Sequence, residues 1–170
     1  GLADSAYNDR RKSCENVAAA ICKHHPEVKS LRDANYELLD EVRGEVSKED
    51  ALRAHYVIGE KERVMEVSAA LEKEDYEEVG KKMYETHDGL SREYEVSCPE
   101  LDFLVDVARD CGVSGARVMG GGFGGCTINL VSQELYANFI EKARKSYQEK
   151  FGKAPIVIDV VIGDGARKLC

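Results

Sequence analysis

The sequence predicts an α+β domain in which helices pack on one face of a small, mostly antiparallel sheet. Two observations lead to this prediction. Apolar residues recur at helical spacing through the first two-thirds of the chain, whereas alternating and β-branched segments begin only after residue 115. The order is therefore several helices, then strand, strand, helix and strand, which is typical of helices segregated to one face of a sheet.

The first helix is expected to begin near Ser5 and to end before Pro26, because proline disfavours helical backbone at the residue before it. A shorter helix is expected over residues 31–42, stopped at Gly44. The apolar face of the first helix holds Tyr7, Cys14, Val17, Ala18 and Ile21. These residues recur at helical spacing, so they predict a buried stripe.

The next helix has a start signal in Ser47 and Asp50, because a side-chain oxygen accepts an orphan N–H and an acid faces the positive helix end. It is expected to reach about Lys73. Its predicted buried stripe consists of Val57, Val64, Val67 and Leu71.

A further helix is expected behind Asp75 and Glu78, which stand at capping-box spacing. One of its faces carries Tyr76, Val79, Gly80, Met83, His87 and Leu90. Because His87 lies on this apolar stripe, the pattern favours a hydrogen-bonded core histidine over a catalytic one.

Ser97 and Glu100 repeat the capping-box spacing, with Pro99 in the first turn, where its missing N–H costs nothing. Gly112 is a natural left-handed stop for this helix. The predicted buried stripe holds Leu101, Leu104, Val105, Ala108 and Cys111.

Strands are expected at residues 116–119, at 126–131, where apolar and polar residues alternate, and at 155–162, which are rich in β-branched residues. Between the last two, a helix is expected from Ser132 to Gly152. Its inward residues are Leu135, Phe139, Ala143 and Tyr147.

Charge and cysteine content narrow the function classes. Lys and Arg number 24 against 32 Asp and Glu, so the net charge of −8 argues against nucleic-acid partners and against a basic membrane-surface helix. Apolar runs such as residues 17–22 are too short to span a bilayer, so no membrane partner is expected. The cysteines are Cys14, Cys22, Cys98, Cys111, Cys126 and Cys170, without a Cys-x-x-Cys pair. They predict free buried thiols in a reducing cytoplasm.

Residues 119–127 read Met-Gly-Gly-Gly-Phe-Gly-Gly-Cys-Thr, so the backbone here must turn sharply or approach another group closely. The spacing matches G-x-G-x-x-G, but the loop leads into a strand rather than a helix, which excludes a dinucleotide fingerprint. A P-loop would need Gly-Lys-Ser/Thr, which is absent. The residues alone leave two interpretations open, an anion-binding nest of N–H groups and a tightly packed hairpin.

Residues 115–127 closely resemble the third signature motif of galactokinases, which belong to the superfamily of galactokinase, homoserine kinase, mevalonate kinase and phosphomevalonate kinase (GHMP kinases). Further segments that resemble galactokinases are residues 2–11, 53–60, 94–102 and 164–170. The resemblance implies a GHMP kinase C-terminal domain-like fold, with residues 1–170 forming the C-terminal domain. The galactose-recognition signature, serine-rich nucleotide loop and Asp–Arg pair of the family cannot be found, so the N-terminal lobe is expected to be missing from this chain.

The resemblance also implies a reaction. The complete enzyme would transfer the γ-phosphoryl group of ATP, with Mg²⁺, to the C1 hydroxyl of α-D-galactose, giving galactose 1-phosphate. Galactose, ATP and the chain's own N-terminal lobe would be its partners. Because the acid–base residues belong to that lobe, no catalytic residue and no metal ligand is expected in this chain. Alone, it should be inactive and bind no cofactor.

By resemblance, Tyr7 contacts the sugar. The glycine loop expected to line the cleft consists of Gly120, Gly121, Gly122, Phe123, Gly124 and Gly125. Arg117, just before this loop, is expected to brace it through an ion pair. Adjacent His24 and His25 cannot share one helical face, so they do not predict a metal site.

Three other functions stay open at this point. The first is an N-acetylgalactosamine kinase of the same superfamily, because N-terminal residues largely choose the sugar. The second is a non-catalytic sensor of galactose and ATP. The third is an interaction module in which the glycine hairpin only packs.

Overall fold

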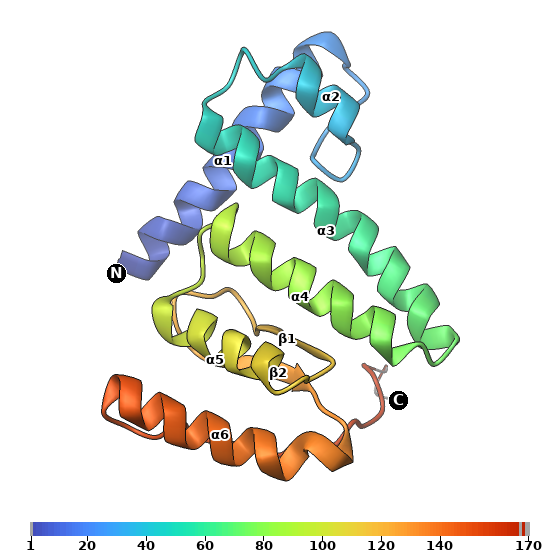
Figure 1. Ribbon diagram of the computed structural model, residues 1–170. Coiled ribbons are helices and arrows are strands. Elements are labelled where there is room, and N and C mark those ends of the chain that lie inside the picture. The colour runs from blue at the N-terminus through green and yellow to red at the C-terminus, as the bar shows by residue number, and fades with distance from the viewer. Residues whose placement is uncertain (1, 167, 169–170) are drawn as a thin grey trace.

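The computed structural model describes residues 2–166 and residue 168. Within this part, six helices and two strands are arranged as Figure 1 shows. The elements are α1 (Leu2–His24), α2 (Tyr36–Glu41), α3 (Lys48–Glu72), α4 (Tyr76–Arg92), α5 (Pro99–Asp110), β1 (Gly115–Val118), β2 (Thr127–Leu130) and α6 (Gln133–Phe151). The predicted helix-rich α+β class is confirmed.

Two of the predicted helix starts are capped as expected. Ser47 Oγ accepts the Asp50 N–H at 3.0 Å, and Asp75 Oδ1 accepts the Glu78 N–H at 3.0 Å. The start of α5 differs, because Cys98 takes the cap position without a side-chain hydrogen bond. The hydroxyl of Ser97 instead donates to Asp102 at 2.5 Å, further along the same helix.

The predicted helix over residues 31–42 is too long. The structure has only α2, with Asn35 as its cap, whose side chain accepts the Leu38 N–H at 2.9 Å. The preceding residues form turns that bury Leu31 and Ala34 against α1 and α3. Because burial of these two side chains is favourable, it stabilises the irregular backbone of this segment relative to a longer helix.

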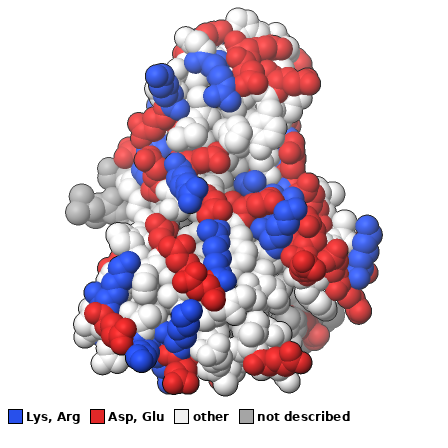
Figure 2. Space-filling model, in the orientation of Figure 1, with Lys and Arg blue, Asp and Glu red and all other residues white. Residues whose placement is uncertain are grey.

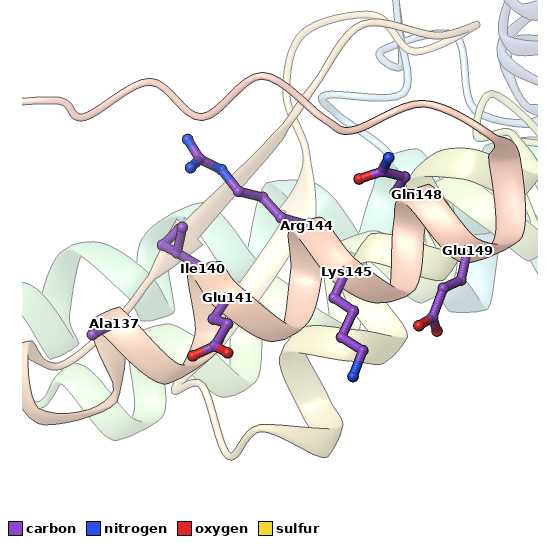
Figure 3. A pocket seen from close by; sticks show the side chains of 7 residues that line it. All are labelled: Ala137, Ile140, Glu141, Arg144, Lys145, Gln148 and Glu149. Atoms are coloured by element: carbon purple, nitrogen blue, oxygen red, sulfur yellow. The ribbon is translucent and has the colours of Figure 1, made fainter.

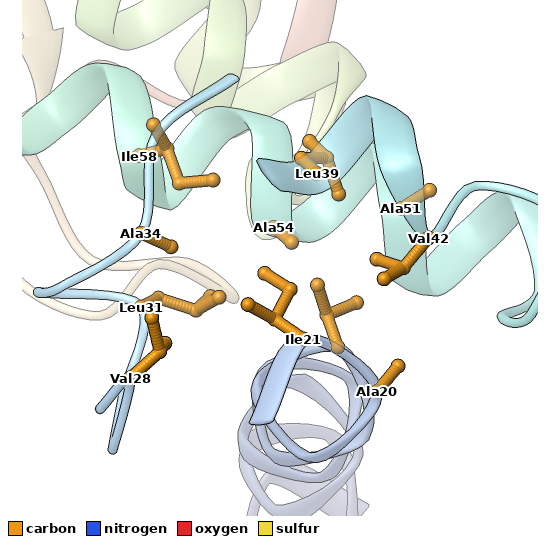
Figure 4. Close-up of a cluster of buried hydrophobic side chains, with 11 residues drawn as sticks. Ala20, Ile21, Val28, Leu31, Ala34, Leu39, Val42, Ala51, Ala54 and Ile58 are labelled. Carbon is orange, nitrogen blue, oxygen red and sulfur yellow. The ribbon is translucent and has the colours of Figure 1, made fainter. Parts of the chain in front are cut away.

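The largest hydrophobic cluster joins α1, α2, α3 and the turns at residues 28–34 (Figure 4). Its buried members are Val17, Ala20, Ile21, Val28, Leu31, Ala34, Leu39, Val42, Ala51, Ala54 and Ile58. The predicted inward residues Val17 and Ile21 of α1 are fully buried. Tyr7 lies beyond this cluster on the same helix and is 44% exposed.

The second half of α3 corrects the predicted stripe. Val64 is 64% exposed and Leu71 is 50% exposed, although their spacing with Val67 fits one helical face. An apolar stripe is buried only where another element covers it. The covered face of α3 instead carries Ala54 and Ile58 in its first half, and Ala70 is buried in its second half.

Two smaller clusters support the sheet. One joins α5, β1 and α6, and its buried members are Val105, Val107, Ala108, Val113, Ala116, Phe139 and Ala143. The other, called here the floor cluster, consists of Tyr56, Leu90, Val96, Leu101 and Val118. Because the floor cluster draws on α3, α4, α5 and β1, it fixes these elements around the end of β1, where the glycine loop begins.

The sheet is a two-stranded antiparallel pair in which Gly115 lies opposite Leu130 and Val118 lies opposite Thr127. The Met119 N–H donates to the Cys126 carbonyl oxygen at 3.0 Å and closes the glycine loop between the strands. Helix α4 crosses β1 at Gly80 and Gly115, where an added Cβ on Gly80 would lie 2.0 Å from the Ser114 carbonyl oxygen. Glycine is therefore required at this crossing.

The predicted third strand at residues 155–162 is wrong for this structure. The segment runs back along α6 without pairing to a strand (Figure 3). The Tyr136 hydroxyl of α6 donates to Asp159. Ile156 is 89% exposed and Val161 is 95% exposed. β-Branched residues favour extended backbone, but a strand also needs a neighbouring ladder of hydrogen bonds.

The surface and the thiols bear on the composition argument. On the face in Figure 2, basic side chains lie among acidic ones. No helix in residues 2–166 has the length and apolar content to cross a bilayer. The five cysteines within the described part are free thiols, as predicted, but Cys126 is exposed and the other four are only half-buried, so the prediction that they are buried is wrong. Cys170 lies outside the described residues.

Candidate functional site

The structure brings Tyr7 and the glycine loop together. The Tyr7 hydroxyl donates to the Gly122 carbonyl oxygen at 3.4 Å, and its ring meets the Phe123 ring edge-on, with centroids 5.1 Å apart. An added Cβ on Gly121 would lie 2.8 Å from the Tyr7 ring. Residues 115 positions apart in the sequence therefore form one exposed surface.

The loop backbone explains its glycines. Gly120, Gly122, Gly124 and Gly125 have φ between +76° and +113°, where an L side chain is strained. Phe123 also has a positive φ, of 58°. Two constraints thus act on this loop, an unusual backbone and contact with Tyr7.

The loop is pinned at its centre to Val96. The Phe123 N–H donates to the Val96 carbonyl oxygen at 2.6 Å. A Cβ on Gly122 would lie 2.1 Å from that same oxygen. Because Val96 belongs to the floor cluster and is 2% exposed, the loop rests on a fixed base.

Arg10 belongs to this surface and was missed as a site residue by the sequence reasoning. Its Nε donates to the Tyr94 carbonyl oxygen at 2.9 Å and its Nη2 donates to the Glu95 carbonyl oxygen at 2.5 Å. The guanidinium also lies 5.2 Å from the centroid of the Phe123 ring. The sequence signal was indirect, because Arg10 and Tyr94 lie in two of the segments that resemble galactokinases.

A second arginine reaches the same turn from α3. Arg53 is 6% exposed, and its Nη1 donates to Ser13 Oγ at 3.0 Å. Its Nη2 lies 3.4 Å from a carboxylate oxygen of Glu95, and it also pairs with Glu49. The backbone of Glu95 has φ 54°, which is unusual for a residue with a side chain. The turn at residues 94–96 is therefore held from both α1 and α3.

The side chains of Tyr94, in the turn, and of Cys14, in α1, meet and are half-buried. The Tyr94 hydroxyl is 4.0 Å from Cys14 Sγ. Burial raises the pKa of Tyr94 to about 12 and also raises the pKa of the Cys14 thiol. At neutral pH both groups keep their protons, so neither is suited to act as a base or nucleophile.

His87 is a buried core residue, as its place on the apolar stripe predicts. It is 3% exposed, and its Nε2 lies 3.2 Å from Asp102 Oδ1, while Nδ1 has no partner in the described part of the chain. Asp102 also accepts the Ser91 and Ser97 hydroxyls at 3.0 and 2.5 Å. This network ties α4 to α5 and to the segment that leads from the turn at residues 94–96.

Burial lowers the pKa of His87 below its usual value near 6.5, and this outweighs the opposing attraction of Asp102. The unfolded chain therefore takes up a proton at a higher pH than the folded chain does. We expect the free energy of unfolding to fall as pH drops below about 6.5, toward the lower folded pKa. Urea unfolding between pH 7.5 and pH 5 measures this.

His87→Gln should remove that part of the pH dependence, because glutamine can still donate to Asp102 but does not titrate. His25→Gln is the control, since the hydrogen bond to Glu41 raises the pKa of partly exposed His25 and predicts a slope of the opposite sign. An unchanged acid slope in the His87 variant would contradict the assignment.

Arg117 lies within β1, before the glycine loop, and its contact differs from the predicted ion pair. Its Nη1 donates to the Val118 carbonyl oxygen at 2.9 Å, so within the described part of the chain it braces the end of the strand through a hydrogen bond.

A surface hollow elsewhere follows α6 and is lined by Ala137, Ile140, Glu141, Arg144, Lys145, Gln148 and Glu149. Figure 3 shows that Arg144 and Gln148 point to one side of the helix. Glu141, Lys145 and Glu149 point to the other side. These side chains do not converge on a common point, so the hollow does not form a built ligand site. Residues 2–166 hold no group of three or more His, Cys, Asp or Glu side chains placed to bind a metal ion.

Known proteins match this chain closely. The family model for the C-terminal domain of GHMP kinases matches residues 67–149. Human galactokinase is 44% identical over 170 residues, covering 99% of this chain. Galactokinase of Clostridium beijerinckii is 40% identical over 171 residues, again covering 99% of the chain. A crystal structure of Lactococcus lactis galactokinase complexed with galactose aligns with 91% of the chain at a TM-score of 0.81 and 27% identity.

The chain spans less than half of these proteins. It covers 41% of the human sequence, 44% of the Clostridium sequence and 40% of the Lactococcus structure. The similarity thus concerns one part of a longer protein in each case.

Proposed function

The chain belongs to the GHMP kinase superfamily, and we propose that residues 1–170 form the C-terminal domain of a galactokinase. The full-length enzyme would transfer the γ-phosphoryl group of ATP to the C1 hydroxyl of α-D-galactose. The observation that carries the proposal is the likeness of 91% of the chain to a galactokinase structure complexed with galactose. Because the relatives compared above are named galactokinases, galactose is favoured over N-acetylgalactosamine.

The proposed role of Tyr7 is to hold a sugar hydroxyl. Its own hydrogen bond to Gly122 is long, at 3.4 Å, and its side chain is 44% exposed. A phenol is both donor and acceptor, so a sugar hydroxyl can replace this weak contact. The glycine loop would line the cleft beside the sugar, where side chains would obstruct the substrates.

ATP fits this proposal in one respect. Within the described residues, the amide N–H groups of Gly124 and Gly125 have no hydrogen-bond acceptor, and such groups favour a nearby negative charge. Mg²⁺ bound to ATP would supply electrostatic stabilisation of the phosphates. By resemblance to galactokinases, we assign the protein ligands of this ion to the proposed N-terminal lobe, together with the acid–base residues.

Positioning accounts for a division of labour between two lobes. Phosphoryl transfer depends on placing the reactants and stabilising charge more than on covalent chemistry by the protein. This chain would supply the sugar contact and one wall of the cleft, and the other lobe would supply the acid–base residues.

A cytoplasmic location is also proposed, supported by the free thiols in the described part.

The assay that tests the function compares galactose with N-acetylgalactosamine as acceptors for the full-length protein with ATP and Mg²⁺. We expect galactose 1-phosphate as the faster product and no turnover by the 170-residue chain alone. Faster phosphorylation of N-acetylgalactosamine would mean that this sugar, and not galactose, is the substrate. Turnover by the isolated chain would contradict the assignment of the acid–base residues to the other lobe.

Tyr7→Phe in the full-length enzyme should raise KM for galactose about fivefold, since one neutral hydrogen bond contributes roughly 1 kcal/mol. The ring packing on Phe123 is kept, so stability should change little. Tyr76→Phe is the matched control, because Tyr76 is an exposed tyrosine at the far end of α4 from the turn at residues 94–96. Equal KM values for the Tyr7→Phe and Tyr76→Phe variants would show that the Tyr7 hydroxyl does not contact the sugar.

A further inference from the structure

The turn at residues 94–96 presents three consecutive carbonyl oxygens to the candidate site. Those of Tyr94 and Glu95 accept hydrogen bonds from Arg10, and that of Val96 accepts the Phe123 N–H. One turn therefore receives donors from α1 and from the glycine loop. Its geometry sets the distance between these two elements.

The turn does not take this shape from backbone preference alone. Glu95 has φ 54°, a conformation that costs about 1 kcal/mol or more for a residue with a Cβ. Two charged donors of Arg10 offset this cost, because hydrogen bonds from a guanidinium are stronger than those between neutral groups. Arg53 holds the Glu95 carboxylate from the other side.

Arg10 also contacts the glycine loop directly. Its guanidinium lies 5.2 Å from the centroid of the Phe123 ring, and the opposing contact to that ring is the edge-on Tyr7. Phe123 is held at φ 58°, so its ring position and its loop backbone are coupled. Tyr7 and Arg10 are three residues apart and share one face of α1.

We propose that Arg10 is a positioning residue, which holds the turn at residues 94–96 and the Phe123 ring in one geometry and so sets the glycine loop against Tyr7. Its planar fork makes two carbonyl bonds while its face lies on a ring, which the point charge of lysine cannot reproduce. The proposal rests on the proposed function for its effect on sugar binding. Its effect on the loop itself is independent of that function.

The test compares Arg10→Gln with Arg11→Gln. Arg11 is the neighbouring residue on the same helix, and its side chain is 79% exposed in an ion pair with Glu15. Both variants remove one positive charge from the same helical turn of α1, but of the two arginines only Arg10 contacts the candidate site. Arg10→Lys is the conservative variant.

The first readout is amide hydrogen exchange at Phe123 in the 170-residue chain. We expect exchange about tenfold faster in Arg10→Gln, wild-type exchange in Arg11→Gln, and an intermediate rate in Arg10→Lys. Exchange at Ile58, in the main core cluster, reports on global stability and should be unchanged. Equal Phe123 exchange in the Arg10→Gln and Arg11→Gln variants overturns the proposal.

The second readout is steady-state kinetics of the full-length protein. Arg10→Gln should raise KM for galactose about tenfold while kcat changes less than twofold, because a displaced loop weakens the sugar contact. A lower kcat at constant KM would indicate only a loss of folded enzyme and would overturn the positioning role. Absence of galactose phosphorylation by the wild-type protein would refute the proposed function, and the exchange data would still decide whether Arg10 holds the loop.

Discussion

Gly122→Ala is expected to destabilise the chain by about 3 kcal/mol and to lower kcat/KM of the full-length enzyme about 100-fold. The backbone at Gly122 has φ +80°, which costs an L residue roughly 1–2 kcal/mol. The new Cβ would also lie 2.1 Å from the Val96 carbonyl oxygen. This is a backbone atom in the floor cluster, so it cannot rotate away as a side chain would.

The loop must therefore leave Val96, and the Phe123 N–H then loses its acceptor. Tyr7 loses its contact with the loop in the same movement, because its hydroxyl bonds the Gly122 carbonyl. A misplacement of about 1 Å between reacting groups is enough to cost on the order of 100-fold in rate. Urea unfolding of the 170-residue chain and steady-state kinetics of the full-length enzyme measure the two effects.

Gly120→Ala separates the two contributions to this loss. Gly120 has φ +76°, nearly the same backbone, but an added Cβ would meet nothing within 4 Å. It should therefore lose only the conformational part, about 1 kcal/mol. Equal losses in both variants would mean that the contact with Val96 does not constrain the loop.

Local signals account for the parts of the fold that were predicted correctly. Ser47 and Asp75 cap helices because a side-chain oxygen within three residues satisfies an orphan N–H, which a sequence displays directly. Gly112 and Gly152 follow helices at φ 73° and 74°, the conformation that glycine alone adopts without strain. Such features depend on neighbours in the chain and not on distant contacts.

The errors arise where distant contacts decide. Val64 and Leu71 have helical spacing, but no pattern in the sequence states which face of α3 the other helices will cover. Residues 155–162 have the composition of a strand, but a strand forms only beside another edge. In each case local propensity describes which backbone the residues favour, but it does not identify the helix or strand that must pack or pair with them.

The candidate site was predictable only in part. Tyr7 and the glycine loop were proposed through resemblance, and the contact between Tyr7 and Gly122 appears only in the structure. Arg10 was not proposed, because its partners are backbone carbonyls of Tyr94 and Glu95, and carbonyls carry no residue-type signal. Sequence motifs therefore do not predict a turn whose contacts are made by its backbone.

The helix–strand crossing beneath the loop provides a second large effect. Gly80→Ala should destabilise the chain by about 3 kcal/mol, because the new Cβ would lie 2.0 Å from the oxygen and 2.4 Å from the carbon of the Ser114 carbonyl group. The better helix propensity of alanine, worth about 1 kcal/mol, offsets only part of the strain. For a chain of this size, the loss corresponds to a fall in Tm of about 10 °C.

Gly44→Ala is the control for this substitution, since nothing lies within 4 Å of an added Cβ there and its stability should change by less than about 0.5 kcal/mol. A loss for Gly80→Ala no larger than that for Gly44→Ala would show that α4 and β1 can separate freely.

Gly115→Ala tests the same crossing from the strand. Its Cβ would lie 2.5 Å from the Gly80 Cα, so it should destabilise the chain comparably. Once α4 has moved away from β1, the second substitution has less to displace. The double variant should therefore lose less than the sum of the two single losses. Because β1 leads directly into the glycine loop, kcat/KM of the full-length enzyme should fall in Gly80→Ala, in Gly115→Ala and in the double variant. Additive losses in the urea unfolding of the double variant would mean that the two glycines relieve separate contacts.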